Sequence, residues 1–503
     1  MKRITYRFFL IVLLSVLAAE VFPVSAQEGS WFDEGNYDEE WLDKNFDNDV
    51  MIISTPEELA AFGEYMTRSL WNYPDKTVRL AADIDMSAHK WITPVNEQFG
   101  SYFSGVFDGD GYTISGLTVV PAEEGGGYDD DYKRVVAGLF GTVRGAEIRD
   151  LTLDETCRVE VPEMYSFYYG NLDLKIGTIA ASAEGDVRFI RCVNRADIVT
   201  TPVLRTGDSH EIVCSVSGLV AHADEVKFLD CSNEGKIIVD IQDNSDVVDI
   251  RVSGLVGRCG PVYGKENRIV SCTNRGNIFV SGNTSGSVSV GGLSSNYTFR
   301  IDSCENHSVV KVNAHEGSAY VGGLVGKAYK LLWNSYSTGD VYSDVAGVKV
   351  CRLSESNVHF CYYNSDAVIE GTEVDEQGIA YSTAEMQSAG SGFLEALNNN
   401  ATKGGTSCRN WGYIPGENDG YPVHIDRIAD GVDSPADHSA GRVYAANGRL
   451  FVQSDRSMQL PVYKVTGQIV KIMNVVEGLN TDYLPCGVYV VAGQVVAVTA
   501  GNK

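Results

Sequence analysis

The sequence repeats a short motif, and this internal repeat limits the fold more than any other feature. An apolar segment with small residues near its centre returns six times, and its Leu or Ile stands at Leu139, Ile179, Leu219, Leu255, Leu293 and Leu324. Successive copies lie 40, 40, 36, 38 and 31 residues apart. Repeats of this length indicate an architecture in which stacked copies of one unit bury a continuous core.

A second motif follows the first in each of the last five units and begins at Cys192, Cys231, Cys272, Cys304 and Ser335. Its third residue is Asn in four units and Ser in the fifth. The residue three before its start is always apolar, and so is the residue six after it, whereas the residue directly before it is always polar. Inward and outward positions therefore keep their places through five units.

Each unit contains Val- and Ile-rich segments separated by Gly and Asn, and none has an apolar stripe at helical spacing. Helical repeats are therefore excluded, and the units are too short for four-stranded propeller blades. We predict an all-β fold, a right-handed parallel β-helix (a solenoid) with about two coils per unit, in which Gly and Asn take the left-handed turn positions.

The Cys column at 192, 231, 272 and 304 has two interpretations, a metal site and a ladder of buried thiols. With two coils per unit, successive members would lie about 9 to 10 Å apart, beyond the reach of a disulfide or a shared metal ion. The thiol ladder is therefore favoured. Eleven Cys are an odd number, so at least one thiol stays unpaired or pairs with another molecule.

The strings Gly138-Leu-Phe-Gly141, Gly254-Leu-Val-Gly257 and Gly323-Leu-Val-Gly326 resemble the GLUG motif of bacterial secreted and cell-surface proteins. Upstream, Ile53-Ser-Thr-Pro-Glu-Glu-Leu59 resembles the segment that leads into such repeats, and the resemblance covers roughly residues 51 to 428. It implies a β-helix. It implies no particular activity, because these repeats occur in adhesin-like proteins and also as appendages of proteases.

Two segments predict helices that cover the ends of the β-helix. Thr55-Pro-Glu-Glu58 is a capping box, and Leu59, Phe62, Met66 and Leu70 follow at helical spacing. Ser382-Thr-Ala-Glu385 repeats the capping box, and an apolar stripe of Met386, Ala389, Phe393 and Leu397 follows it, with Gly390 and Gly392 weakening the middle.

The first 26 residues have the order of a secretory signal peptide, with basic residues, an apolar stretch from Phe8 to Leu17 and the small residues Val24-Ser25-Ala26. The alternative is a membrane anchor, but the apolar stretch is about half a bilayer span. We therefore expect a secreted monomer without a membrane-spanning segment, located in the periplasm, at the outer-membrane surface or outside the cell.

The remaining chain divides into four parts. Residues 27–50 form an acidic leader that we expect to be extended or disordered, residues 51–428 the β-helix with its caps, residues 429–441 a linker, and residues 442–503 a small β-sandwich. The strings Val462-Tyr-Lys-Val-Thr-Gly467 and Leu484-Pro-Cys-Gly-Val-Tyr-Val490 are similar to C-terminal sorting or attachment domains of Bacteroidetes proteins. That similarity implies passage across the outer membrane.

Charge and motifs exclude several classes of function. The chain has 67 acidic and 40 basic residues, a net charge of −27, which argues against nucleic acid as a partner. The eight His form no HExxH motif, and the sequence has no GxSxG or GxxxxGK. We assign no catalytic or cofactor-binding residue.

Calcium is the one metal with candidate ligands, because it binds several oxygen atoms at flexible spacing. Asp108 and Asp110 are the candidates, although a turn is the favoured interpretation. Asp43, Asn45 and Asp47 match the first EF-hand positions, but Asn48 replaces the required Gly, so a solvated leader is favoured there. We expect no cofactor otherwise.

These observations lead to three hypotheses about function. The first is an adhesin-like binding protein that recognises a glycan or a host or envelope protein through its lateral face. The second is a polysaccharide-active hydrolase or lyase, which would need paired carboxylates about 5 to 10 Å apart in a lateral groove. The third is a structural stalk, favoured if the lateral faces lack exposed aromatic side chains.

Overall fold

The computed structural model describes residues 29–498 with internal gaps. The gaps are residues 69–72, 96–101, 125–131, 162–170, 202–211, 242–246, 260–266, 283, 285, 298, 314–317, 329–330, 346–347, 356, 402–409, 415, 426–439, 447–448, 455–457, 465–468, 477, 486 and 492–493. The expected signal peptide lies outside the described residues. The described chain is mostly β-structure with few helices, and none of its helices is both long and apolar enough to span a membrane.

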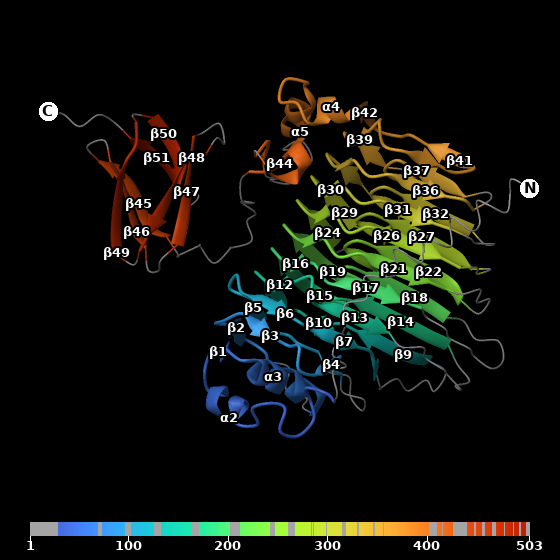
Figure 1. Cartoon of the computed structure of the whole chain (residues 1–503), viewed down its shortest axis with the longest axis horizontal. Coiled ribbons are helices and arrows are strands. Elements are labelled where there is room, and N and C mark those ends of the chain that lie inside the picture. Colours follow the sequence, from blue (N-terminus) through green and yellow to red (C-terminus); the bar gives the residue numbers. More distant parts are fainter. Residues whose placement is uncertain are drawn as a thin grey trace, which may run out of the picture.

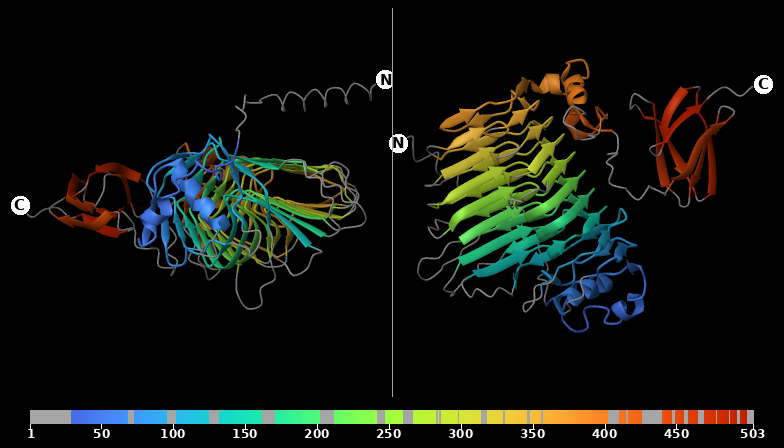
Figure 2. Two further views of the ribbon diagram at one scale, coloured as in Figure 1. Left: turned by 90° about the horizontal axis from the view of Figure 1, so that it is seen from below. Right: turned by 180° about the vertical axis from the view of Figure 1, so that it is seen from behind.

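Four long sheets of stacked strands make up the body of the molecule (Figures 1 and 2), an arrangement consistent with a β-helix. Sheets A and C have nine and ten strands. The strands of sheet A are β4 (Lys90–Ile92), β7 (Thr118–Val120), β13 (Arg158–Val161), β17 (Asp197–Thr200), β21 (Ile237–Asp240), β26 (Ile278–Ser281), β31 (Val310–Val312), β36 (Val341–Ser343) and β40 (Ile369–Glu370). Those of sheet C are β3 (Ile84–Asp85), β6 (Thr113–Ser115), β12 (Thr152–Leu153), β16 (Val193–Asn194), β20 (Ser232–Asn233), β25 (Thr273–Asn274), β30 (Glu305–Asn306), β35 (Tyr336–Ser337), β39 (Tyr362–Asn364) and β42 (Ile379–Tyr381).

Sheets B and D have 14 and nine strands. The main path of sheet B is β1 (Val50–Ile53), β2 (Thr77–Leu80), β5 (Val106–Asp108), β11 (Glu147–Arg149), β15 (Ala180–Ile190), β19 (Val220–Leu229), β24 (Asn267–Val270), β29 (Phe299–Asp302), β34 (Leu332–Trp333) and β38 (Val358–His359). Its side branch is β10 (Phe140–Arg144), β23 (Val256–Cys259), β28 (Ser294–Tyr297) and β33 (Val325–Ala328). Sheet D contains β41 (Glu373–Asp375), β37 (Lys349–Cys351), β32 (Ser318–Gly322), β27 (Ser287–Gly291), β22 (Val247–Ser253), β18 (Ile212–Ser217), β14 (Asn171–Gly177), β9 (Tyr132–Ala137) and β8 (Ala122–Glu124).

Each repeat unit forms one rung of this stack. Phe189, Phe228, Ile269, Ile301 and Leu332, the predicted apolar column, are register partners on successive strands of sheet B. All five side chains are buried. The predicted column is confirmed, but the prediction of two coils per unit is wrong. One unit supplies strands to all four sheets, and this uses its whole length of 31 to 40 residues.

The Cys column is a ladder of buried thiols, as predicted, but its members are closer than predicted because they lie on adjacent rungs. The backbone N–H of Cys231 donates to Sγ of Cys272 at 3.3 Å, and that of Cys272 donates to Sγ of Cys304 at 3.4 Å. Cys192, Cys231, Cys272 and Cys304 are free thiols with at most 1% exposure. Burial is the largest influence on the Cys192 thiol and raises its pKa well above the usual value.

The two sequence motifs meet in the core, which explains why they alternate. Asn194, Asn233, Asn274 and Asn306 form a hydrogen-bonded row through successive rungs, with N···O distances of 2.7, 2.8 and 2.9 Å. A Cβ atom added to Gly254 would lie 2.4 Å from Oδ1 of Asn274 and 2.2 Å from the carbonyl oxygen of Gly292. The motif glycine therefore leaves the space that the Asn row occupies.

The prediction that Gly and Asn take the left-handed turn positions is correct only in part: Gly145, Gly185 and Gly282 have positive φ, but the repeated turn column mostly holds other residues. The residue directly before each second motif has a positive φ, and these residues are Arg191 (52°), Asp230 (60°), Ser271 (53°), Ser303 (52°) and Asn334 (46°). Only the last is Asn and none is Gly. The polar column is thus a turn column, in which tertiary context holds ordinary residues in a conformation that favours Gly and Asn.

The N-terminal helix is confirmed, and the leader is ordered rather than disordered. In α3 (Pro56–Arg68), the predicted side chains Leu59, Phe62 and Met66 are buried, whereas Leu70 lies outside the described residues. Thr55 and Glu58 form the capping box, with both reciprocal hydrogen bonds at 3.2 Å. The leader contains α2 (Trp41–Asn45) and packs Trp31 and Trp41 against the core. The apolar area of these two indoles stabilises the leader in spite of its acidic composition.

The second predicted helix is split in two. The capping box at Ser382 and Glu385 starts α4 (Thr383–Met386), and α5 (Phe393–Ala401) follows after the two glycines. Trp333 Nε1 donates to the carbonyl oxygen of Asn400 at 3.0 Å, and Asn334 Nδ2 donates to that of Leu397 at 3.0 Å. These contacts place α5 against the sides of the last rungs.

Beyond the gap at 426–439, the strands are antiparallel. One sheet contains β45 (Ala440–Ala446), β46 (Arg449–Ser454) and β49 (Gly478–Tyr483), and the other contains β48 (Ile469–Val475), β47 (Met458–Lys464), β50 (Gly487–Val491) and β51 (Gln494–Val498). One buried apolar cluster includes Leu450 and Val452 from the first sheet and Val462 and Met473 from the second.

Candidate functional site

The calcium candidate Asp108 lies at the end of β5, where it is enclosed by basic residues. Its Oδ2 atom is 2.9 Å from Nη2 of Arg149 and 3.3 Å from Nε of Arg79, and its Oδ1 atom accepts from the backbone N–H of Asp110 at 3.0 Å. Burial would raise the pKa of Asp108, but the hydrogen bond and charge of Arg149 outweigh it and lower the pKa. Asp110 has a φ of 47°, so the segment is a tight turn held by two guanidinium groups.

No group of three or more His, Cys, Asp or Glu in the described part of the chain is arranged to hold a metal ion. Of the EF-hand-like residues, Asn45 ends α2, where its Nδ2 donates to the carbonyl oxygen of Trp41 at 2.8 Å. The side chain of Asn45 therefore serves the local helix end.

A buried carboxylate that the sequence did not single out lies on the outward side of sheet C. Thr273, Glu305 and Tyr336 are register partners on β25, β30 and β35. Each of these strands has two residues, of which the second, Asn or Ser, belongs to the inward Asn row. Glu305 is only 2% exposed, although its position faces outward.

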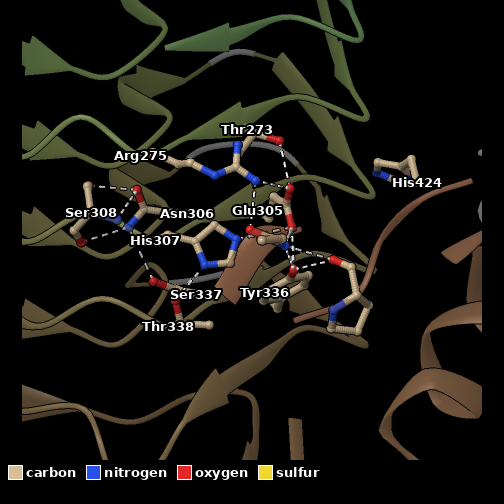
Figure 3. Close-up of polar contacts among 12 residues, drawn as sticks. Thr273, Arg275, Glu305, Asn306, His307, Ser308, Tyr336, Ser337, Thr338 and His424 are labelled. Carbon is tan, nitrogen blue, oxygen red and sulfur yellow. Dashed lines mark hydrogen bonds and ion pairs between the residues drawn. The ribbon is translucent and has the colours of Figure 1, made fainter. Parts of the chain in front are cut away.

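Five side chains surround this carboxylate (Figure 3), and we call them with Glu305 the Glu305 network. Oε1 accepts from Thr273 Oγ1 at 2.8 Å and lies 3.5 Å from Arg275 Nη2. Oε2 lies 3.2 Å from His307 Nε2, accepts from Asn418 Nδ2 at 3.2 Å, and is hydrogen-bonded to the Tyr336 hydroxyl. Burial would raise the pKa of Glu305, but His307, Arg275 and Tyr336 outweigh it and lower the pKa to about 2.

The network fastens a distant segment of the chain to sheet C. This segment runs from β43 (Trp411–Gly412) through the turn at Asn418–Gly420 to β44 (Val423–His424). Arg275 Nη2 donates to Asn418 Oδ1 at 2.7 Å, the Tyr336 hydroxyl lies 2.7 Å from the carbonyl oxygen of Pro422, and His424 Nε2 lies 2.8 Å from that of Ser303. A carboxylate with this many donors and so low a pKa is a structural anchor, not a general acid or base poised near neutral pH.

The outward side of sheet B carries a second feature, which we call the basic row. Arg188, Lys227, Arg268 and Arg300 are register partners on four successive strands, β15, β19, β24 and β29. Strands in register lie about 4.8 Å apart, so the row places one cation at each step. The other outward positions of these strands hold Ile190, Leu229, Val270 and Asp302.

Acidic residues flank the basic row. Arg188 Nη1 lies 3.9 Å from Glu147, Lys227 Nζ lies 3.4 Å from Asp186, and Arg300 Nε lies 2.7 Å from Asp302. The side chains of Arg188 and Lys227 keep 30% and 32% exposure, so solvent still reaches this part of the row. A sequence signal for the row exists, because its members all stand four residues before the Cys that opens the second motif.

Aromatic side chains reach the surface of sheet A. Val199, Ile238, Phe279, Lys311 and Tyr342 form one outward row on successive strands. Phe279 and Tyr342 are partly exposed, and Val199 is 55% exposed. The lateral faces therefore do not lack aromatic groups.

The chain matches no protein-family model and no curated protein. Among solved structures, the crystal structure of a "putative immunoglobulin A1 protease" from Bacteroides ovatus is similar, with a TM-score of 0.39 and 15% sequence identity. The alignment covers 74% of this chain and 91% of that chain. The candidate sites therefore rest on the residues of this chain alone.

Proposed function

We propose that this protein is a secreted or surface-displayed binding protein whose basic row on sheet B binds the acidic groups of a glycan. In this proposal the body is a right-handed β-helix of the GLUG type, and residues 442–503 form a β-sandwich that serves sorting or attachment. The observation that carries the proposal is the alignment of four cations on consecutive strands.

Electrostatics supports a polyanionic ligand. Two like charges about 4.8 Å apart repel by on the order of 1 kcal/mol in water and by more near a protein surface. The flanking carboxylates offset part of this repulsion: Glu147 ends the row on β11, as the register partner of Arg188, and Asp186 and Asp302 lie beside it. A linear chain with repeated carboxylate or sulfate groups would contact several cations at once, and each contact would release counterions.

The net negative charge of the chain opposes general binding of polyanions and restricts it to the basic row. With a net charge of −27, the protein repels nucleic acid except where a local row reverses the sign. The Glu305 carboxylate is not counted as a catalytic candidate in this proposal, because Thr273, His307 and Asn418 already occupy it.

Affinity electrophoresis of the mature protein in gels containing polygalacturonate or neutral dextran tests the proposal. We expect retardation by polygalacturonate only, and a steep loss of that retardation between low and moderate salt. The double variant Lys227→Gln/Arg268→Gln should weaken binding at least tenfold. The control Lys236→Gln/Lys311→Gln should bind like the parent. It removes one cation directly before β21 and one on β31, both at sheet A.

Equal retardation of both double variants would show that binding does not use the basic row. Equal retardation of the parent by dextran and polygalacturonate would reject an acidic ligand. Secretion is tested separately by N-terminal sequencing of the exported protein, which should begin at Gln27.

A further inference from the structure

Sheets B and D meet along a polar seam that the basic row does not include. Lys175, Ser215 and Arg251 are register partners on β14, β18 and β22 of sheet D. Ser182, His222 and Arg258 are register partners on β15, β19 and β23 of sheet B. Lys175 Nζ donates to Ser182 Oγ at 3.3 Å, which shows that the two rows face each other. We call these six residues the seam.

Cations outnumber acids in the seam and its immediate surroundings. Lys175 Nζ lies 3.6 Å from Asp173, and Arg251 forms an ion pair with Asp249. Arg258 has neither a hydrogen bond nor an ion pair with its side chain among the described residues. Two rungs further along sheets D and B, Lys327 Nζ lies 4.5 Å from the ring centre of Tyr320 and adds another positive charge.

Two polar atoms in the seam are buried without a partner within the described residues, Nδ1 of His222 and Nη1 of Arg251. The Arg251 side chain is 12% exposed, and His222 and Arg258 are likewise only partly buried, so the seam is not closed off from solvent. Native structures rarely leave such groups unsatisfied, and each exception requires an explanation, such as a functional role or a bound water or ion.

Burial and the surrounding positive charge both favour the neutral form of the His222 ring. Burial, followed by Lys175, Arg258 and Arg251, lowers the pKa of His222 to about 3. A neutral imidazole has one N–H donor and one acceptor nitrogen, so it adds a hydrogen bond to the seam without adding charge. The guanidinium groups of Arg251 and Arg258 supply planar donor forks, which match a carboxylate.

We propose that the seam binds one carboxylate group of a sugar acid, held by Arg251 and Arg258 with His222 as a hydrogen-bond donor. This site goes beyond the proposed function, because it shares no residue with the basic row. On β15 the two are separated by a register shift between Glu184 and Val187: Ser182 of the seam lies before the shift and Arg188 of the row after it. A single carboxylate also differs from the repeated charges that the row requires.

Isothermal titration calorimetry of the full mature chain tests this site with glucuronate, glucose and sulfate as probes. We expect saturable binding of glucuronate, no binding of glucose, and weaker binding of sulfate because it lacks the planar shape. Arg258→Gln should weaken glucuronate binding at least tenfold. Arg195→Gln makes the same chemical change at a surface ion pair with Glu234, outside the seam and the basic row, and should leave glucuronate binding unchanged.

His222→Gln provides a second variant, since Gln keeps a donor and an acceptor without the ring, and we expect a three- to tenfold loss. The inference is overturned if the parent does not bind glucuronate, if sulfate binds more tightly than glucuronate, or if a folded Arg258→Gln protein binds glucuronate like the parent. If the parent binds glucuronate but is not retarded by polygalacturonate, the role of the basic row is rejected and the seam is retained.

Discussion

The Glu305 network and the seam are both clusters of buried charge, but they are completed in opposite ways. Around Glu305, donors from Thr273, Arg275, His307, Tyr336 and Asn418 saturate one carboxylate. In the seam, cations outnumber acids, and two polar atoms have no partner within the described part of the chain. The first cluster joins two parts of the protein, whereas in the second the acids Asp173 and Asp249 leave two buried polar atoms without a partner among the described residues.

This difference predicts that buried charges with a structural role and buried charges with a binding role respond differently to mutation. Removing a charge from a saturated cluster leaves its buried partners uncompensated, which is costly. Removing a charge from a cluster with excess like charge relieves repulsion, so it should change stability little. Stability and binding measurements on the two clusters should therefore diverge.

The largest expected effect is that of Glu305→Gln. Loss of a buried, paired charge should lower the free energy of unfolding at pH 7 by about 3 kcal/mol. Because the folded pKa of Glu305, about 2, lies below its ordinary value of 4.5, its contribution is present above pH 4.5 and is lost as the pH falls toward 2. Urea unfolding at pH 7 and pH 3 should show a smaller difference between parent and variant at the lower pH.

Glu184→Gln is the matched control. Glu184 pairs with Arg144 at 2.7 Å, but both side chains are at least 40% exposed, so its loss should cost less than about 1 kcal/mol. A stability difference for Glu305→Gln that stays constant from pH 7 to pH 3 would contradict the low pKa.

Tyr336→Phe should have a smaller effect, about 1 to 2 kcal/mol, because it removes one hydroxyl next to Glu305 and the Pro422 carbonyl oxygen but keeps the charge. Hydrogen exchange of residues 418–424 should become faster than in the parent. Unchanged exchange would mean that the network does not hold this segment.

Arg258→Gln should change the free energy of unfolding by less than about 1 kcal/mol, in either direction, because the side chain forms no hydrogen bond or close ion pair among the described residues and its charge acts on Asp249 only at longer range. Since Arg258 is one of the charges that lower the pKa of His222, the variant should raise that pKa from about 3, as measured by NMR titration of the ring. A destabilisation comparable with that of Glu305→Gln would remove the contrast between the two clusters.

The smallest expected effect is that of Lys227→Gln, which removes an exposed ion pair with Asp186. We expect a change below about 0.5 kcal/mol in urea unfolding, even though the same residue contributes to the proposed glycan face. A large loss of stability would assign the basic row to folding instead of binding.

Repeated apolar positions made the β-architecture predictable, because a column such as Phe189 and Phe228 must stay buried in every unit. The number of coils was not predictable from unit length. The number of coils depends on how many strands one coil contains and on how long they are. Because strands such as β15 have as many as 11 residues, one coil takes up the whole length of a unit. The prediction of an extended or disordered leader was wrong because it rested on the acidic residues and neglected Trp31 and Trp41, which are buried.

The sites depended on contacts that a single sequence hides. Glu305 accepts a hydrogen bond from Asn418, which lies 113 residues away in the sequence, so no local pattern marks it. The seam did leave a signal, because Lys175 and Ser182, Ser215 and His222, and Arg251 and Arg258 are each seven residues apart across the repeated turn. The seven-residue spacing alone does not predict contact between the paired residues. The structure shows the contact, because sheets B and D face each other there.

The Asn row described in the core also has a direction. Each Nδ2 group donates toward the C-terminal end of the stack, from Asn194 through Asn233 and Asn274 to Asn306, which donates to Ser337. The amide dipoles therefore point the same way and add up along the axis, as peptide dipoles do in a helix. Their positive end lies on β30 and β35, the strands that also carry the Glu305 carboxylate and its Tyr336 partner, so the polarity of the core favours a negative charge where the chain has buried one.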